Sequence, residues 1–180
     1  MQISRPIHIK LSQGPDVSDH DFVEEEDKCL ACICVRTMSL AVGRGIFTMH
    51  TINPIPTEPV IIPEMNLKGK SVTKKTTIDL TRVEIPSNMT YWPLFHNGVA
   101  AGLTICAQAK DLSNAWIRSH LAKNFELTNE KAGFLYGLGL KGHLSNFSML
   151  NVHDALTRRH DLTNIAILLG LAASKYVKLF

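Results

Sequence analysis

Apolar and small residues recur at helical spacing through the second half of the chain, from residue 93 onward. Three stretches share one unit, a tiny residue followed four positions later by a Gly-Leu pair: HNGVAAGLTICA, KAGFLYGLGLKG and NIAILLGLAASK. The Gly-Leu pairs are separated by 35 and 33 residues. A period of this length is typical of helical repeat proteins. The repeated positions are Gly98, Gly102, Leu103, Gly133, Gly137, Leu138, Ala166, Gly170 and Leu171.

The tiny residues of each unit predict a close contact between helices. Residues four apart lie on one helix face, and tiny side chains there let a neighbouring helix approach closely. The stretches DLSNAWIRSHLAK and MLNVHDALTRRH lie between the units and are predicted to be their partner helices. Residues 93–180 are therefore predicted to form about two and a half helical-hairpin repeats, an incomplete solenoid.

The energetics of glycine sharpen this prediction. Six glycines would lie in helix interiors, and each costs roughly 1 kcal/mol relative to alanine, or about 6 kcal/mol together. That sum is comparable with the net stability of a domain, so close packing must offset it. The six are Gly98, Gly102, Gly133, Gly137, Gly139 and Gly170.

The first half of the chain has a different pattern. Residues 1–21 are predicted to be extended. A helix is predicted over residues 22–42, because the acidic run EEED precedes the apolar run CLACICV and acidic residues favour a helix N-terminus. Residues 43–92 are rich in proline and contain the β-prone pieces IFTMHTI, PVIIP and TTIDLTRVEI. Proline interrupts helices, so this segment is predicted to be extended with short strands. The fold class is thus mainly α, a helical solenoid preceded by an irregular segment with short β-strands.

Composition and charge exclude several functions. Apolar residues make up 45% and charged residues 19%, an ordinary globular balance, and the net charge of +3 gives no support for a nucleic-acid partner. No apolar run is long enough for a membrane span, and the N-terminus lacks a signal-peptide core. We therefore expect no membrane association and a location in the nucleus and cytoplasm.

The run GLGLKG, residues 137–142, matches the pattern G-x-G-x-x-G of dinucleotide-binding folds. That function needs a strand directly before the glycines and a helix after them. Here Thr128 or Asn129 can cap a helix that is already running, and Gly142 suits the helix C-terminus. The glycines are therefore interpreted as packing positions, and no cofactor is expected.

Other chemistry is sparse. Cys29, Cys32 and Cys34 form C-x-x-C-x-C, but a zinc site needs four ligands and Cys106 is far along the chain. Buried cysteine behaves as a small hydrophobic residue, so no metal site is expected. Lys68, Lys70, Lys74 and Lys75 are expected to form a solvated turn, and Asn151 or Asp161 to cap helices. No catalytic residues are expected.

The chain resembles a known family in PDVSDHDFVEEE, RTMSLAVGRGIFT, PIPTEP, MNLKG, FHNGVAAGL, AWI, AGFLYGLGLKGHL and LNVHDALTRRHDLTNIAILLGLAASK. These stretches are similar, in order, to the family of the largest scaffold subunit of the anaphase-promoting complex, subunit 1. The resemblance implies repeats of the proteasome/cyclosome type, which form a closed or nearly closed α-helical solenoid. The alternative is a non-ATPase scaffold of the proteasome regulatory particle, which carries the same repeat; GRGIFT, PIPTEP and FHNGVAAGL favour the ligase.

The resemblance also implies what such a chain does. It would be a non-catalytic scaffold of a cullin-RING ubiquitin ligase that marks mitotic regulators for degradation. Its partners would be the cullin-RING module, the tetratricopeptide scaffold subunits, and the co-activator and processivity subunits. Because solenoid repeats need capping units, the chain is expected to be a fragment, or a truncated gene product, from the start of the repeat domain.

Overall fold

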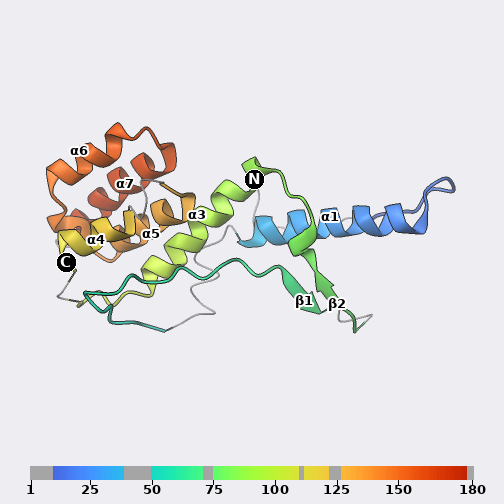
Figure 1. The fold of residues 1–180 in the computed structure, drawn as a ribbon, viewed down its shortest axis with the longest axis horizontal. Coiled ribbons are helices and arrows are strands. Elements are labelled where there is room, and N and C mark those ends of the chain that lie inside the picture. The colour runs from blue at the N-terminus through green and yellow to red at the C-terminus, as the bar shows by residue number, and fades with distance from the viewer. Residues whose placement is uncertain (1–9, 39–49, 71–74, 110–111, 122–126, 178–180) are drawn as a thin grey trace. The chain divides into compact units, whose positions relative to one another are not determined.

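The structure is a computed structural model, and it describes residues 10–38, 50–70, 75–109, 112–121 and 127–177 (Figure 1). Over these residues the chain is mainly helical, with a small sheet of two antiparallel strands. The mainly α fold class predicted from the sequence is therefore confirmed. None of the helices in these ranges is long and apolar enough to cross a membrane.

The chain divides into two compact units. One consists of residues 1–37 and 66–90, and the other of residues 38–65 and 91–180. The predicted extended segment at residues 1–9 and the end of the predicted helix at residues 39–42 lie outside the described residues.

Helix α1 (Asp19–Met38) begins before the predicted start at Phe22. Ser18 caps it: its Oγ accepts from the backbone N–H of Asp21 at 3.2 Å and donates to the Asp21 carboxylate at 2.8 Å. Ser18 thereby satisfies one of the free backbone N–H groups at the helix N-terminus. The run EEED therefore lies inside the helix and not in its first turn. The Glu24 carboxylate pairs with the Lys28 ammonium, one helical turn later, at 2.6 Å.

One face of α1 is apolar and buried at Ala31 and Val35, which are one turn apart. Cys29, Cys32 and Cys34 are half-buried free thiols. Burial raises the pKa of the Cys34 thiol, which favours the neutral form. This environment suits small hydrophobic side chains better than metal-binding thiolates.

A hairpin follows in the same unit. Strand β1 (Lys68–Lys70) pairs antiparallel with β2 (Thr77–Asp79), and Lys68 lies opposite Asp79. The Lys68 ammonium contacts the Asp79 carboxylate at 3.2 Å. Strand β2 lies in the predicted β-prone piece TTIDLTRVEI, whereas the expectation of a turn at Lys68 and Lys70 was wrong because cross-strand pairing holds both lysines in β1. Lys74 lies outside the described residues. The short 3₁₀ helix η1 (Leu80–Arg82) ends the hairpin and buries Leu80.

The predicted strand PVIIP does not form. Over residues 50–65 the backbone is extended, and the only strand-like pairing is a parallel bridge between Ile52 and Ile105. Prolines in this stretch lack the N–H that a β ladder needs. We call residues 50–65 the extended segment.

Helix α3 (Ser87–Leu103) begins earlier than the predicted boundary at residue 93, so residues 87–92 are helical and not extended. The backbone N–H of Met89 donates to Pro86, which closes the first turn before Pro93 is reached. Pro93 lies inside the helix, where it removes one backbone donor and its ring crowds the carbonyl of the residue four positions earlier. The helix nevertheless continues through Pro93 to Leu103.

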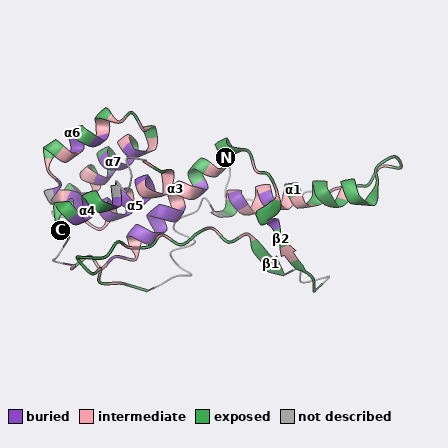
Figure 2. Ribbon diagram, in the orientation of Figure 1, coloured by how far each residue is buried: buried purple, intermediate pink, exposed green. Residues whose placement is uncertain are grey.

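The remaining elements are α4 (Asn114–Leu121), α5 (Asn129–Leu140), the 3₁₀ helix η2 (His143–Asn146), α6 (Met149–Thr157) and α7 (Asp161–Val177). Both partner stretches predicted between the repeated units are thus helical, as α4 and α6. Buried residues concentrate on α3 and α5 (Figure 2). The core is formed around Ile105, Trp116, Phe134, Leu138 and Ile167.

The helix caps explain several of these boundaries. Thr128 caps α5 by accepting from the backbone N–H of Lys131, and Gly142 adopts the left-handed conformation after its end, both as predicted. The predicted caps Asn151 and Asp161 were wrong, since both lie inside helices. Ser148 caps α6. His160 caps α7, because its ring Nδ1 accepts from the backbone N–H of Thr163 at 3.2 Å.

Candidate functional site, a glycine-lined helix stack

The backbones of α3 and α5 are in contact at two glycines, Gly98 of α3 and Gly133 of α5. A Cβ added at Gly98 would overlap the backbone carbonyl oxygen of Glu130. A Cβ added at Gly133 would overlap the carbonyl oxygen of Phe95 and lie 2.7 Å from its carbonyl carbon. Carbon atoms in ordinary contact are about 3.5–4.0 Å apart. Only glycine fits at either position with the helices at this spacing.

One turn further along the same two helices, the contact is repeated. A Cβ at Gly102 would lie 2.6 Å from the carbonyl oxygen of Phe134, and a Cβ at Gly137 would lie 2.7 Å from that of Val99. The obstructing atoms are again backbone, which no side-chain rotation can move. The tiny residues at i and i+4 thus form one continuous contact between α3 and α5.

Helix α5 contacts α7 through a different glycine. A Cβ at Gly139 would overlap the Cα of Gly170 and lie 2.7 Å from its carbonyl carbon. Beside this contact the buried Ser174 Oγ donates to the carbonyl oxygen of Gly139 at 2.8 Å. Gly139 is not one of the repeated positions. Its signal in the sequence is a glycine two positions after Gly137 in GLGLKG, which the repeat pattern alone does not explain.

The other repeated positions support this stack. Leu138 and Ala166 are fully buried, while Leu103 and Leu171 are half-buried and pack against the core clusters. The structure therefore places α5 between α3 and α7, with glycine at both contacts.

The G-x-G-x-x-G run lies in a geometry unlike a phosphate-binding turn. Gly137 and Gly139 are inside α5, and Gly142, with φ of +87°, follows its end. A dinucleotide site needs these glycines between a strand and the start of a helix. The glycines serve helix packing and termination here.

The extended segment joins this stack at its start. The backbone N–H of Ile52 donates to the carbonyl of Thr104 at 2.8 Å, and the N–H of Cys106 donates to the carbonyl of Ile52 at 2.9 Å. These two bonds form the parallel bridge to Ile105 at the end of α3. The segment is thereby fixed to the residues that follow the first repeated Gly-Leu pair.

Asn97 ties the far end of the extended segment to two helices. Its side chain is 2% exposed, and its Nδ2 donates to the carbonyl of Pro63 at 2.6 Å and to Glu130 Oε1 at 3.3 Å. The residue lies on α3 next to Gly98, so it joins α3, α5 and the extended segment at the closest helix contact. Asn97 is not among the residues predicted from the sequence; its signal there is a polar residue inside the apolar run FHNGVAAGL.

Two side chains of α4 hold the middle of the extended segment. Trp116 Nε1 donates to the carbonyl of Glu58 at 3.2 Å, and the backbone N–H of Val60 donates to His120 Nε2 at 2.8 Å. Because Nε2 accepts, the proton of a neutral ring lies on Nδ1, which then donates to the carbonyl of Trp116 at 2.9 Å. Both ring nitrogens are therefore used by the backbone.

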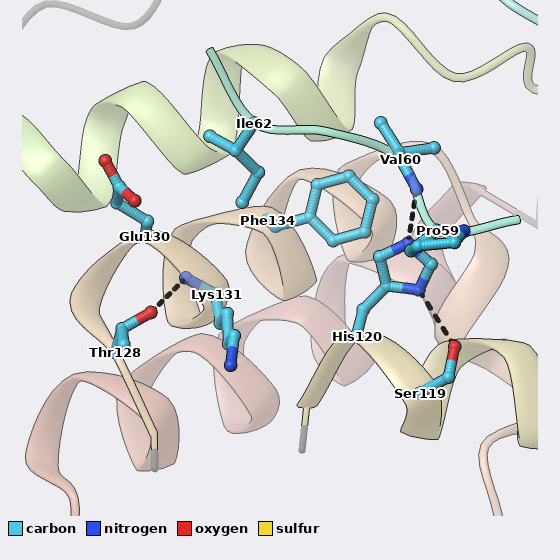
Figure 3. A pocket seen from close by; sticks show the side chains of 9 residues that line it. All are labelled: Pro59, Val60, Ile62, Ser119, His120, Thr128, Glu130, Lys131 and Phe134. Carbon is cyan, nitrogen blue, oxygen red and sulfur yellow. Dashed lines mark hydrogen bonds between the residues drawn. The ribbon is translucent and has the colours of Figure 1, made fainter. Parts of the chain in front are cut away.

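A cavity of about 320 Å³ lies beside His120 (Figure 3). The Phe134 ring, which stacks on the His120 imidazole with centroids 5.0 Å apart, forms one wall. Val60 and Ile62 of the extended segment form another. Most of the surface that lines the cavity is apolar, although His120, Glu130 and Lys131 also line it. The complete lining is Pro59, Val60, Ile62, Ser119, His120, Thr128, Glu130, Lys131 and Phe134.

Two histidines of this unit have lowered pKa values. Burial lowers the pKa of His96, whose Nδ1 is buried without a hydrogen-bond partner. Burial also lowers the pKa of His143, although its Nε2 lies 3.1 Å from the Cys106 carbonyl, a bond that favours the charged form. Desolvation of the charged ring is the dominant cause at both positions. Neutral imidazoles are thus part of the folded state.

Comparison with known proteins covers almost the whole chain. The family model described as the APC1 fourth domain matches residues 1–176. The chain is 48% identical over 177 residues, 97% of its length, to anaphase-promoting complex subunit 1 of Homo sapiens, and 36% identical over 175 residues, also 97%, to the protein of that name in Dictyostelium discoideum. It is 35% identical over 160 residues, 89% of its length, to a negative regulator of mitosis in Emericella nidulans.

The relatives are much longer proteins. The chain covers 9% of the human relative and 8% of each of the other two. The match nevertheless extends across both the repeated units and the irregular segment before them. The chain belongs to the anaphase-promoting complex subunit 1 family.

Proposed function

We propose that the chain is part of a non-catalytic scaffold subunit of the anaphase-promoting complex, a cullin-RING ubiquitin ligase that controls the metaphase/anaphase transition and mitotic exit. The observation that carries this proposal is the backbone contact between helices at Gly98 and Gly133. Two helices whose backbones touch have little room to slide or tilt, and such close packing favours a rigid stack. Rigidity over a long distance is what a platform for other subunits needs.

We infer further that the stack is a solenoid of proteasome/cyclosome-type repeats. Helix α5 meets α7 at positions that recur. Ala132 shares a buried cluster with Ala166, the Leu135 carbonyl lies 3.6 Å from a Cβ built at Gly170, and Gly139 touches Gly170. The face of α5 that binds the next repeat is thus defined by Ala132, Leu135 and Gly139.

The corresponding face of α7 is apolar and exposed. Alignment of Gly137 with Gly170 places Ile165, Leu168 and Ala172 where α5 has these three contact residues. Ile165 is 41% and Leu168 56% exposed. Exposed apolar residues at interface positions indicate that a further helix of the longer protein covers them. This regular continuation supports a solenoid.

The partners of the scaffold follow from the family. We propose the cullin-RING module, the tetratricopeptide scaffold subunits, and the co-activator and processivity subunits as partners, and the nucleus and cytoplasm as the location. The second candidate function, a non-ATPase scaffold of the proteasome regulatory particle, would use the same glycine contacts. The names of the relatives favour the ligase.

Affinity capture tests the choice between these functions. The tagged full-length protein is isolated from dividing cells, and its companions are identified by mass spectrometry. Recovery of cullin and RING subunits supports the ligase scaffold. Recovery of proteasomal ATPases in their place would rule it out.

A pair of variants tests the solenoid. In the full-length protein, the double substitution Ile165→Glu and Leu168→Glu places charges on the exposed face of α7 and is expected to prevent the next helix from packing. Lys175→Glu, a charge reversal at an exposed position of the same helix, is the matched control. Equal recovery of complex subunits and equal protease resistance for both variants would contradict a covered α7 face.

A further inference from the structure

We propose that Met149 and Leu150 of α6 anchor a separate subunit, which covers them with an apolar segment that also carries a carboxylate. The inference deepens the proposed function and rests on it, because a separate subunit is at hand only if the chain is part of a complex. We call Met149, Leu150 and His153 the α6 patch.

The α6 patch begins with two large apolar side chains that the described residues leave open to solvent. Met149 and Leu150 are each 79% exposed. His153, one helical turn later, is also exposed. Single exposed apolar residues are ordinary on a protein surface. An adjacent pair this exposed needs a reason, which lies either in the fold or in a partner.

The preceding repeat shows what the fold requires at these positions. Ser113 caps α4 as Ser148 caps α6, in each case by accepting from the backbone N–H three residues later. The two caps are 35 residues apart, the spacing of the first two Gly-Leu pairs. Four residues after each cap a side chain is buried, Ile117 in α4 and Val152 in α6. The two helices are therefore equivalent, residue by residue, over this stretch.

This equivalence places Asn114 and Ala115 of α4 where α6 has Met149 and Leu150. Helix α4 forms with a polar and a small side chain there, so the helix stack does not require large apolar ones. Asn114 and Ala115 are exposed although a further repeat, with α6, follows them. In a regular solenoid the next repeat would leave Met149 and Leu150 equally open. We therefore assign the α6 patch to a separate subunit.

The charges of α6 define the chemistry of that contact. The first turn of α6 holds no acidic residue, and the one carboxylate of the helix, Asp154, pairs with Arg158 at 2.8 Å. The first N–H groups of a helix have no acceptor within it and give this end a partial positive charge. The α6 patch thus combines two apolar side chains with a positive helix end and an imidazole. An apolar side chain next to Asp or Glu complements both features.

The α6 patch is one anchor of a larger interface. A stable interface buries about 800 Å² on each partner, which is more than two side chains supply. A few residues nevertheless carry most of the binding energy of an interface, and methionine is enriched among interface residues. Other parts of the longer protein supply the remaining contact area, so the test requires the assembled complex.

Oxidation of Met149 tests whether a separate subunit covers the α6 patch. Dilute hydrogen peroxide transfers one oxygen atom to an accessible thioether, giving the sulfoxide and water, and mass spectrometry of the Met149 peptide gives the rate. The full-length protein is measured alone and in the purified complex, and we expect oxidation to be severalfold slower in the complex. Equal, fast oxidation in both would show that nothing covers the patch, and slow oxidation in both would show that the same polypeptide covers it. Either result overturns the proposal.

Cross-linking tests the chemistry of the occupant. A photoreactive residue is placed at position 150 of the full-length protein, and the cross-linked peptide of the complex is sequenced. We expect a peptide of a separate subunit with an apolar residue next to Asp or Glu. A peptide of the same polypeptide, or one without a carboxylate, would contradict the proposal.

A pair of variants tests whether the α6 patch contributes to binding. Met149→Asp with Leu150→Asp should leave the full-length protein folded, because both side chains are exposed, and should weaken binding of the cross-linked subunit at least about tenfold, the factor that losing the burial of one such side chain gives. Asn114→Asp with Ala115→Asp, at the equivalent positions of α4, is the matched control and should bind as wild type. Equal binding by the two variants would overturn the proposal. The proposed function fails separately, if the wild-type protein captures no cullin or RING subunit.

Discussion

The contact at Gly133 allows a sharp test of the helix stack by substitution with alanine. In Gly133→Ala the new methyl group would overlap the Phe95 carbonyl oxygen and lie 2.7 Å from the carbonyl carbon. Because carbon atoms pack at about 3.5–4.0 Å, α3 and α5 must separate by at least about 1 Å. All the obstructing atoms nearest the methyl group belong to backbone, so the helices themselves must move.

The magnitude follows from two opposing effects. Overpacking costs about 1–3 kcal/mol where side chains can adjust, and more where they cannot. Alanine returns about 1 kcal/mol through its higher helix propensity. The separation also loses packing at Gly98, Gly102 and Gly137, which depend on the same helix spacing. We expect a net loss of at least about 2 kcal/mol in the free energy of unfolding.

Gly170→Ala is the matched control, since it adds the same methyl group inside a helix of the same stack. Its nearest obstruction is Leu144 Cδ1 at 2.9 Å, the end of a flexible side chain, and the Gly139 Cα is 3.5 Å away. Helix propensity offsets the remaining cost, so we expect a change within about 1 kcal/mol of zero. The stabilities of the two variants therefore differ in a predicted order.

Urea unfolding followed by far-ultraviolet circular dichroism measures this order. A Gly133→Ala protein that fails to fold while Gly170→Ala folds gives the same ranking. Equal stability of Gly133→Ala and wild type, or a larger loss in Gly170→Ala, would refute the argument that backbone contact requires these glycines.

Three further predictions concern polar groups. Asn97→Ala leaves the Pro63 carbonyl without its donor and should lower the free energy of unfolding by about 1–3 kcal/mol, measured by urea unfolding, with exposed Asn88→Ala unchanged as control. The lowered pKa values of His96 and His143 mean that the unfolded chain binds protons first, so the urea midpoint should be constant above about pH 6.5 and fall below it; a midpoint that rises on acidification would contradict this. Hydrogen bonds from Thr81 and contact with Lys68 lower the pKa of Asp79 to about 2. The Asp79 carboxylate therefore stabilises the hairpin above its unfolded pKa of about 3.9, and this stabilisation is lost as the pH falls through the folded value. Asp79→Asn should therefore speed amide exchange at Leu80 near neutral pH.

The sequence predicts the helices of the second unit well because each carries its own signal. The cap at Thr128, the left-handed glycine at 142 and the period of tiny residues are local features, and α5 agrees with them. The start of α3 was missed because Pro93 predicts an interrupted helix, whereas the turn closed by the backbone N–H of Met89 has only a weak signal in the sequence. Strand β1 was missed because a basic run is expected in a turn until its partner, Asp79, is known.

The extended segment was the harder problem, and its physics explains why. Its conformation is set by Asn97, Trp116 and His120, which are 34, 58 and 60 residues from their backbone partners. No period or cap in residues 50–65 encodes such contacts. The sequence shows only that prolines forbid a helix there.

Glycine spacing within α5 carries more information than the repeat alone. Gly133 and Gly137 are four residues apart and face α3, whereas Gly139 lies two residues further, about 200° around the helix from Gly137, and faces α7. A helix with tiny residues on a single face can pack closely with one neighbour only. By placing glycine on two opposite faces, α5 meets α3 and α7 at backbone contact at the same time. The run GLG therefore allows close packing on both sides of α5, against α3 and against α7. Its resemblance to a nucleotide-binding pattern is a consequence of that spacing.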